Sequence, residues 1–128
     1  MAVEIPVSWG ELFDKLTILR IKSARISDDS KRANISAELA ALERVTTAHR
    51  LPEKELQRLT TELHQVNEAL WDIEDDIRRC ERQQDFSDRF IELARAVYRT
   101  NDKRAAVKRA INDLLGSELV EEKSYEAY

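Results

Sequence analysis

The sequence is poor in the residues that break helices or cross-link chains. It contains two glycines, two prolines and one cysteine in 128 residues. The scarcity of glycine and proline argues against a β-sandwich or barrel, whose short strands need frequent turns. A single cysteine excludes an internal disulfide. Because Cys80 falls on an apolar stripe, we expect it to be a small buried hydrophobe.

Long apolar runs and a strong net charge are also missing. No run approaches the roughly 18 apolar residues of a membrane span, and Met1–Pro6 lacks the basic-then-apolar pattern of a secretory signal. We therefore expect a protein of the bacterial-type cytoplasm that does not contact a membrane. The formal net charge of −4 gives no general attraction to nucleic acid, so no nucleic-acid partner is expected.

Recognisable catalytic motifs are absent as well. The chain has no Gly-rich phosphate loop, nucleophile elbow or zinc motif. His49 and His64 have no cysteine or histidine companion at ligand spacing, so we expect both near the surface. The sequence therefore leans against an enzyme, and no cofactor is expected.

The residues that are present predict one all-α domain over 1–128. Hydrophobic residues make up 42% and charged residues 36% of the chain, which is typical of helices with charged outer faces. Ser8 and Glu11 fit a capping box that begins the first helix at Trp9, and Gly116 fits the left-handed residue that ends the last one. The predicted order is an extended arm packed onto the body (1–7), a short helical hairpin (8–50), a long helical hairpin (52–115) and a tail folded back over the bundle (116–128).

The long hairpin is the predicted organising element. Its two helices, at 52–83 and 87–115, carry apolar residues at alternating steps of three and four, which form the seam of helices packed along their length. The apolar seam positions are Leu56, Leu59, Leu63, Val66, Leu70, Ile73, Ile77, Cys80, Phe86, Phe90, Leu93, Val97, Val107, Ile111 and Leu114. The spacing keeps its phase through Asn101 and Asp102, which predicts a continuous second helix. The expected fold is an antiparallel helical bundle, with the short hairpin packed on the long one.

Rows of opposite charge accompany this seam. The acidic row on the first long helix is Glu68, Asp72, Glu74, Asp75 and Asp76, and the basic row on the second is Arg95, Arg99, Lys103, Arg104, Lys108 and Arg109. An antiparallel register brings the rows level, but most of these side chains point outward. They are either solvated surface charge or charges that meet a second copy across a two-fold axis. Because the two short helices cannot cover both long ones, we predict a homodimer.

Arg104 is a charge at a seam position of the long hairpin. A charge there needs a counter-charge or a route to water, and the antiparallel register places Glu62 and Asn67 near it. One hypothesis is a structural ion pair. The other is an anion site, in which guanidinium and amide donors bind phosphate or carboxylate. The residues of that site would be Arg99, Asn101, Arg104 and Lys108.

Carboxylates spaced at three and four residues allow a magnesium hypothesis. Such pairs on neighbouring helices could bind Mg²⁺ and polarise a phosphate, as in the all-α nucleotide pyrophosphohydrolases. The candidate ligands are Glu11, Asp14, Glu68, Asp72, Asp75 and Asp76. Magnesium would be a cofactor only under this alternative, because spacing alone is a weak signal in so charged a chain.

Four stretches of the chain combine apolar and polar residues in a distinctive way. They are Pro6–Leu19, Leu70–Arg78, Ala94–Ala105 and Glu121–Tyr125. Together they resemble an uncharacterised bacterial family of small α-helical proteins, a domain of unknown function, over nearly the whole chain. The resemblance supports the helical fold and implies no activity, cofactor or catalytic residue.

The resemblance also groups polar residues that helix packing alone does not demand. These are Asp14, Lys15, Glu74, Arg78, Asn101, Asp102, Arg104 and Lys123. If the first helix and the tail lie over the long hairpin, they form one polar cluster, either a ligand pocket or a buried ion-pair network. The favoured function is a non-catalytic cytoplasmic interaction or assembly protein. The alternatives are a binding module or enzyme for an anionic, phosphate-containing small molecule, and the magnesium-dependent enzyme.

Overall fold

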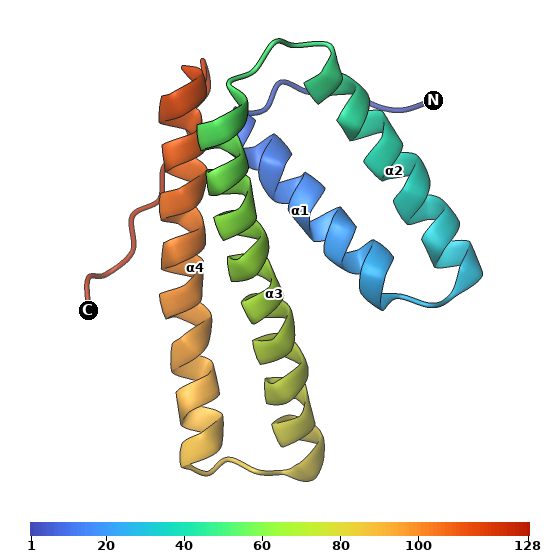
Figure 1. The fold of residues 1–128 in the computed structure, drawn as a ribbon. Helices are drawn as coiled ribbons and strands as arrows, with labels where there is room; N and C mark the ends of the chain where they lie inside the picture. Colours follow the sequence, from blue (N-terminus) through green and yellow to red (C-terminus); the bar gives the residue numbers. More distant parts are fainter.

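The computed structural model describes residues 1–128 and contains four helices and no strand. The helices are α1 (Trp9–Arg25), α2 (Asp29–Thr47), α3 (Glu53–Gln83) and α4 (Asp88–Leu115) (Figure 1). The predicted all-α fold is confirmed, and α4 is continuous through Asn101 and Asp102 as expected. None of the helices is both long enough and apolar enough to span a membrane.

The helix ends follow from local side-chain chemistry. The Ser8 hydroxyl accepts the backbone N–H of Glu11 at 3.1 Å, and the Asp28 carboxylate accepts an N–H of the first turn of α2 at 2.9 Å. Both long helices end in a left-handed residue, Gln84 with φ of 56° and Gly116 with φ of 59°. The predicted cap at Ser8 and the predicted glycine stop are therefore present.

The helix that all others contact is α1. It packs against α2, α3 and α4, the two long helices pack against each other, and α2 contacts α1 alone. Buried residues on more than one side of α1 explain its central place, because a helix with so broad an apolar surface needs several neighbours. The short hairpin therefore meets the long one through α1 only, as Figure 1 shows.

The core lies where α1 crosses the half of the long hairpin in which α3 begins and α4 ends (Figure 1). Its buried apolar side chains come from three helices: Leu12, Phe13 and Leu16 of α1, Leu56, Leu59 and Leu63 of α3, and Val107 and Ile111 of α4. The predicted seam of the long hairpin thus forms a core in this half only.

The other half of the long hairpin extends beyond α1 and α2 (Figure 1). We call residues 73–96 the hairpin tip. Cys80 is its one buried side chain, at 2% exposure, which matches the prediction for this thiol. The aromatic and aliphatic side chains of Phe86 and Ile91 are 50% and 51% exposed. The seam continues into the tip, where its residues are half-buried between α3 and α4, but neither α1 nor α2 covers the tip.

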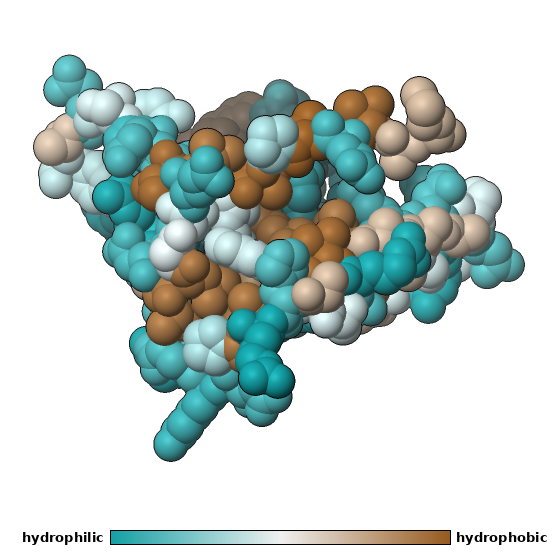
Figure 2. All heavy atoms as spheres, turned by 90° about the horizontal axis from the view of Figure 1, so that it is seen from above, coloured by the Kyte–Doolittle hydropathy of each residue, from teal (hydrophilic) through white to brown (hydrophobic).

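The two ends of the chain behave differently. The arm, residues 1–7, is extended as predicted, but all seven residues are exposed, so the expectation that it packs onto the body is wrong. The apolar stripe of α2 faces α1 and so offers the arm no apolar surface. The tail folds back along α4 as predicted, where Glu121 bonds Lys108. Figure 2 looks onto the end of the bundle where α4 ends, and shows apolar patches there that polar side chains interrupt.

Candidate functional site

A buried carboxylate joins three helices at the edge of the core. Asp14 of α1 is 1% exposed. Its Oδ1 accepts from Asn67 Nδ2 of α3 and from Arg104 Nε of α4, both at 2.9 Å, and its Oδ2 accepts from Arg104 Nη2. A bidentate arginine and an amide therefore hold this carboxylate from two sides. The counter-charge that Arg104 needs comes from α1 rather than from the partner helix of the long hairpin.

Thr17, one turn along α1, completes the hydrogen bonds around Asp14. Its hydroxyl donates to the backbone carbonyl of Asp14 at 2.8 Å and accepts from Asn67 Nδ2 at 2.9 Å. No buried side-chain nitrogen or oxygen in the chain lacks a partner. No sequence pattern pointed to a role for Thr17, whereas the register of the long hairpin placed Asn67 near Arg104.

Lys108 extends the cluster from α4 toward the tail. Its side chain is 9% exposed, and its Nζ donates to Glu11 Oε2 and to Glu121 Oε2, both at 2.9 Å. Burial is the largest influence on the pKa of Lys108 and acts to lower it, but these two hydrogen bonds and the charge of Asp14 outweigh burial and raise the pKa. The hydrogen bonds that Arg104 donates to Asp14 raise the pKa of Arg104 as well. Both side chains therefore remain cations at neutral pH.

The start of α1 is held by the end of α4. The N–H of Gly10 donates to Asn112 Oδ1 at 2.6 Å, and the N–H of Trp9 donates to Ser117 Oγ at 3.2 Å. These are N–H groups that a helix leaves without an internal partner. The predicted capping box is half correct, because the carboxylate of Glu11 turns to Lys108 instead of returning to the cap.

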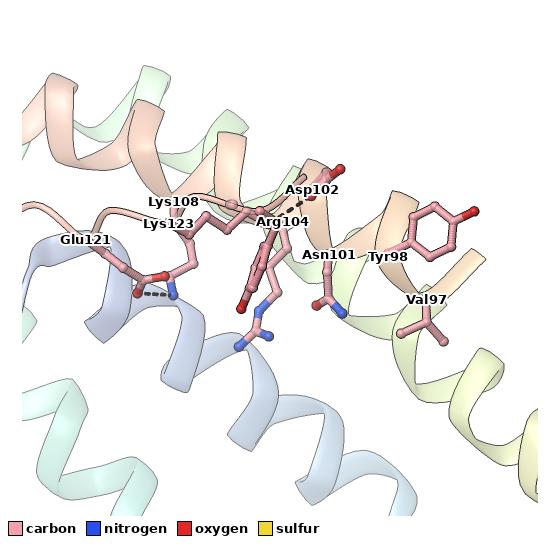
Figure 3. A pocket seen from close by; sticks show the side chains of 10 residues that line it. Val97, Tyr98, Asn101, Asp102, Arg104, Lys108, Glu121 and Lys123 are labelled. Carbon is pink, nitrogen blue, oxygen red and sulfur yellow. Dashed lines mark hydrogen bonds and ion pairs between the residues drawn. The ribbon is translucent and has the colours of Figure 1, made fainter. Parts of the chain in front are cut away.

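A cavity of about 380 Å³ lies beside this cluster, between α4 and the tail (Figure 3). Its lining residues are Val97, Tyr98, Asn101, Asp102, Arg104, Ala105, Lys108, Glu121, Lys123 and Tyr125. Three members of the predicted anion site therefore share one cavity. The fourth, Arg99, is exposed and does not line it.

Family membership follows from the chain as a whole. Residues 1–128 match the model of a family of unknown function, DUF6165. The chain belongs to that family. The match includes all four stretches on which the resemblance to an uncharacterised family rests, and so confirms it. No curated protein and no solved structure matches the chain.

In this DUF6165 chain the predicted polar cluster divides into separate groups. Asp14 and Arg104 form the buried pair, while Lys123 Nζ donates to Asp102 Oδ1 at 2.8 Å at the rim of the cavity. Lys15 is exposed, and Glu74 pairs with Arg78 within the hairpin tip at 2.8 Å, so these three lie outside the cluster. The predicted cluster is therefore a buried Asp14–Arg104 pair, an exposed Asp102–Lys123 pair and the unbonded side chain of Asn101, arranged around one cavity.

The six carboxylates of the magnesium hypothesis are not brought together. No three His, Cys, Asp or Glu side chains are arranged to hold a metal ion. Asp72 accepts from Arg25 Nη1 at 2.5 Å, while Glu11 and Asp14 bond cations of α4. The hypothesis lacks the geometry it needs, because α1 and α3 meet through arginine and amide groups rather than through facing acids. The histidines lie near the surface: the His64 ring contacts Glu68 at 3.1 Å, and that of His49 packs edge-on against Trp9.

Asp102 fastens the end of the tail. It accepts from Lys123 Nζ and, at 2.5 Å, from the Tyr128 hydroxyl, and these bonds lower its pKa below the ordinary 3.8. The ionised carboxylate of Asp102 stabilises the attached tail fully at pH values above the ordinary pKa. This stabilisation is lost as the pH falls through the lowered pKa and the carboxylate becomes protonated. The tail should therefore stay attached at neutral pH.

We expect Asp102→Ala to release the end of the tail, from Lys123 onward, without unfolding the helices. The lost bonds are exposed ones, which contribute little to global stability, but the chain around Lys123 becomes accessible. Trypsin should then cleave after Lys123 several-fold faster, as measured by mass spectrometry. The matched control is Asp113→Ala, which removes an exposed carboxylate that pairs only with Arg109 of its own helix. Equal cleavage rates in the two variants would contradict this role of Asp102.

Proposed function

We propose that the protein is a non-catalytic assembly protein of the cytoplasm that acts as a homodimer through the hairpin tip. The observation that carries the proposal is the apolar surface of the tip, where Phe86 and Ile91 are half-exposed and Cys80 alone is buried. Long helices depend on packing against an apolar face for most of their stability. The tip thus presents an apolar surface that needs a partner.

A second copy of the same tip is the partner that fits best. The α3 arm of the tip, residues 73–83, is roughly 16 Å long, because an α-helix rises about 1.5 Å per residue. Two such hairpins packed side by side would form a four-helix arrangement with both seams inside. In a dimer with two-fold symmetry both copies use the same surface, so Phe86 and Ile91 of each copy would lie in the interface.

The charges on the long hairpin support the same partner. No ion pair joins α3 to α4, and the pairs in the tip, such as Arg79–Asp76 and Arg95–Glu92, each stay within one helix. Asp75 of α3 and Arg99 and Lys103 of α4 make no ion pair in the chain. Asp75 of one copy and Arg99 or Lys103 of the other are therefore available to each other at the rim of the interface, where charges steer association.

The buried charges favour a non-catalytic role. Asp14, Arg104 and Lys108 are all engaged with one another or with Glu11 and Glu121. Their hydrogen bonds tie α1 to α3, to α4 and to the tail. This arrangement suits a structural network that fixes how the short hairpin sits on the long one.

Ile91→Asp tests the proposed interface. A carboxylate at a half-exposed position of the tip should leave the monomer folded but weaken a dimer roughly 30-fold or more, since a central interface residue is worth about 2 kcal/mol. Light scattering during size-exclusion chromatography, at several micromolar concentrations, measures the mass. We expect a dimer for the original chain and a monomer for the variant.

The matched control is Val45→Asp on α2, where the residue is apolar, 42% exposed and outside the tip. This variant should remain a dimer. If the original chain were a monomer, the proposal would be overturned. If Val45→Asp dissociated the dimer and Ile91→Asp did not, the interface would lie on α2 and not on the hairpin tip.

A further inference from the structure

The cavity beside α4 contains hydrogen-bonding groups that the fold does not use. The side chain of Asn101 makes no hydrogen bond within the chain, although it lines the cavity. Arg104 bonds Asp14 through Nε and Nη2, and the remaining N–H groups of its guanidinium have no partner. Its side chain is 31% exposed. Figure 3 shows Asn101 and Arg104 side by side, so their unused donors are available together.

Glu121 indicates which kind of group the cations of the cavity can bind. Its carboxylate, which the tail brings into the cavity, accepts from Lys108 Nζ, and Figure 3 shows this contact at one side of the cavity. The side chain of Glu121 is 51% exposed and belongs to a segment without helix or strand. Lys108 is buried, but Glu121 reaches it from a half-exposed position on an irregular segment and Lys108 keeps its bond to Glu11, so another carboxylate can take the place of Glu121.

The local charge selects the class of ligand. Three cations, Arg104, Lys108 and Lys123, are matched by four carboxylates in and behind the cavity, which are Glu11, Asp14, Asp102 and Glu121. A phosphate dianion would add charge to a site that is already slightly acidic. A single carboxylate that replaces Glu121 leaves the balance unchanged, and it can also accept from Arg104 and Asn101.

The lining of the cavity also includes apolar and aromatic side chains. Val97 and Ala105 of α4 line it together with Tyr98 and Tyr125. A volume of about 380 Å³ lies within the range of small-molecule sites. We propose that this cavity binds a small monocarboxylate with an apolar or aromatic body, whose carboxylate takes the place of Glu121 beside Lys108 and Arg104. The proposal does not depend on dimerisation, since no lining residue belongs to the hairpin tip.

Benzoate is a suitable probe, because it carries one carboxylate on an aromatic ring. In an NMR titration of the full chain, benzoate should shift the side-chain amide signals of Asn101 and the Nε–H signal of Arg104 in a saturable way. Benzamide, which has the same shape without the charge, should shift neither signal. Inorganic phosphate should bind more weakly than benzoate.

Glu121→Gln removes the carboxylate that competes with the ligand. We expect it to tighten benzoate binding about tenfold, the usual scale for a hydrogen-bonded charge. Glu122→Gln is the control, since Glu122 is the next carboxylate along the tail and pairs with Arg109 outside the cavity. It should leave the benzoate affinity unchanged.

Three results would overturn the proposal. The first is the absence of saturable shifts in Glu121→Gln, and the second is an equal effect of Glu121→Gln and Glu122→Gln. The third is tighter binding of phosphate than of benzoate, which would replace the monocarboxylate with an oxyanion of higher charge.

Discussion

Asp14→Ala is expected to lower the free energy of unfolding by about 3–5 kcal/mol, the usual cost of removing one partner of a buried ion pair. The substitution leaves Arg104 without the carboxylate that binds two of its nitrogens, and it removes one of the two acceptors of Asn67, which keeps only Thr17 Oγ1. Lys108, whose Nζ lies 3.9 Å from Asp14 Oδ2, also loses a neighbouring negative charge. Urea unfolding followed by circular dichroism, at one fixed protein concentration, measures the change.

The control for this variant is Asp75→Ala, which removes an exposed carboxylate without an ion-pair partner and should change stability by less than about 0.5 kcal/mol. Adding Arg104→Met to Asp14→Ala should restore part of the loss, because the double variant no longer contains the unpaired arginine. A loss below about 1 kcal/mol for Asp14→Ala would show that the network does not hold the helices together.

The importance of Asp14 shows where the sequence stops being informative. Periodicity along the long hairpin correctly predicted two packed helices, and the charge of Arg104 on their seam correctly signalled a missing partner. The register of two antiparallel helices, however, can only nominate residues of the opposite helix, such as Asn67. The true counter-charge is separated from Arg104 by 90 positions and lies on a helix that crosses the hairpin. Crossing contacts of this kind leave no repeating pattern in the sequence.

The start of α1 also combines a local contact that is predictable from the sequence with distant contacts that are not. Ser8 was predictable as a cap, because the capping oxygen and its N–H lie three residues apart. The partners of Gly10 and Glu11 were not, since Asn112 and Lys108 are 102 and 97 positions away. Local rules therefore placed the helix ends correctly, while the contacts that fix α1 on α4 depend on the folded arrangement.

The way in which α1 contacts α4 also explains which apolar surface is left over. The tethered start of α1 places its buried face on the half of the long hairpin where α4 ends. At the other end of α1, Arg25 reaches Asp72 and no further along α3. One helix of this length covers half of the hairpin, so the tip is left uncovered by the same contacts that build the core.

Gly10→Ala is expected to destabilise the protein by about 3 kcal/mol, the upper part of the usual range for overpacking. A Cβ at this position would lie 2.5 Å from the backbone oxygen of Lys108 and 3.0 Å from Asn112 Oδ1. The closer atom belongs to the backbone of α4 and cannot rotate away, so α1 must move off α4. That movement stretches the hydrogen bond from Gly10 to Asn112, whose present length is 2.6 Å. The higher helix propensity of alanine offsets at most about 1 kcal/mol.

Gly116→Ala is the control that distinguishes the steric clash at Gly10 from the general cost of replacing a glycine. No atom lies within 4 Å of a Cβ at Gly116, so the cost there comes only from the left-handed backbone, about 1–2 kcal/mol. Urea unfolding should therefore rank Gly10→Ala as the more damaging change. Hydrogen exchange gives a second measure: the amides of the first turn of α1 should exchange faster in Gly10→Ala and stay protected in Gly116→Ala. If the two variants were equally stable and equally protected, the start of α1 would not be held against α4, and the capping of α1 by Asn112 and Ser117 would have no energetic role.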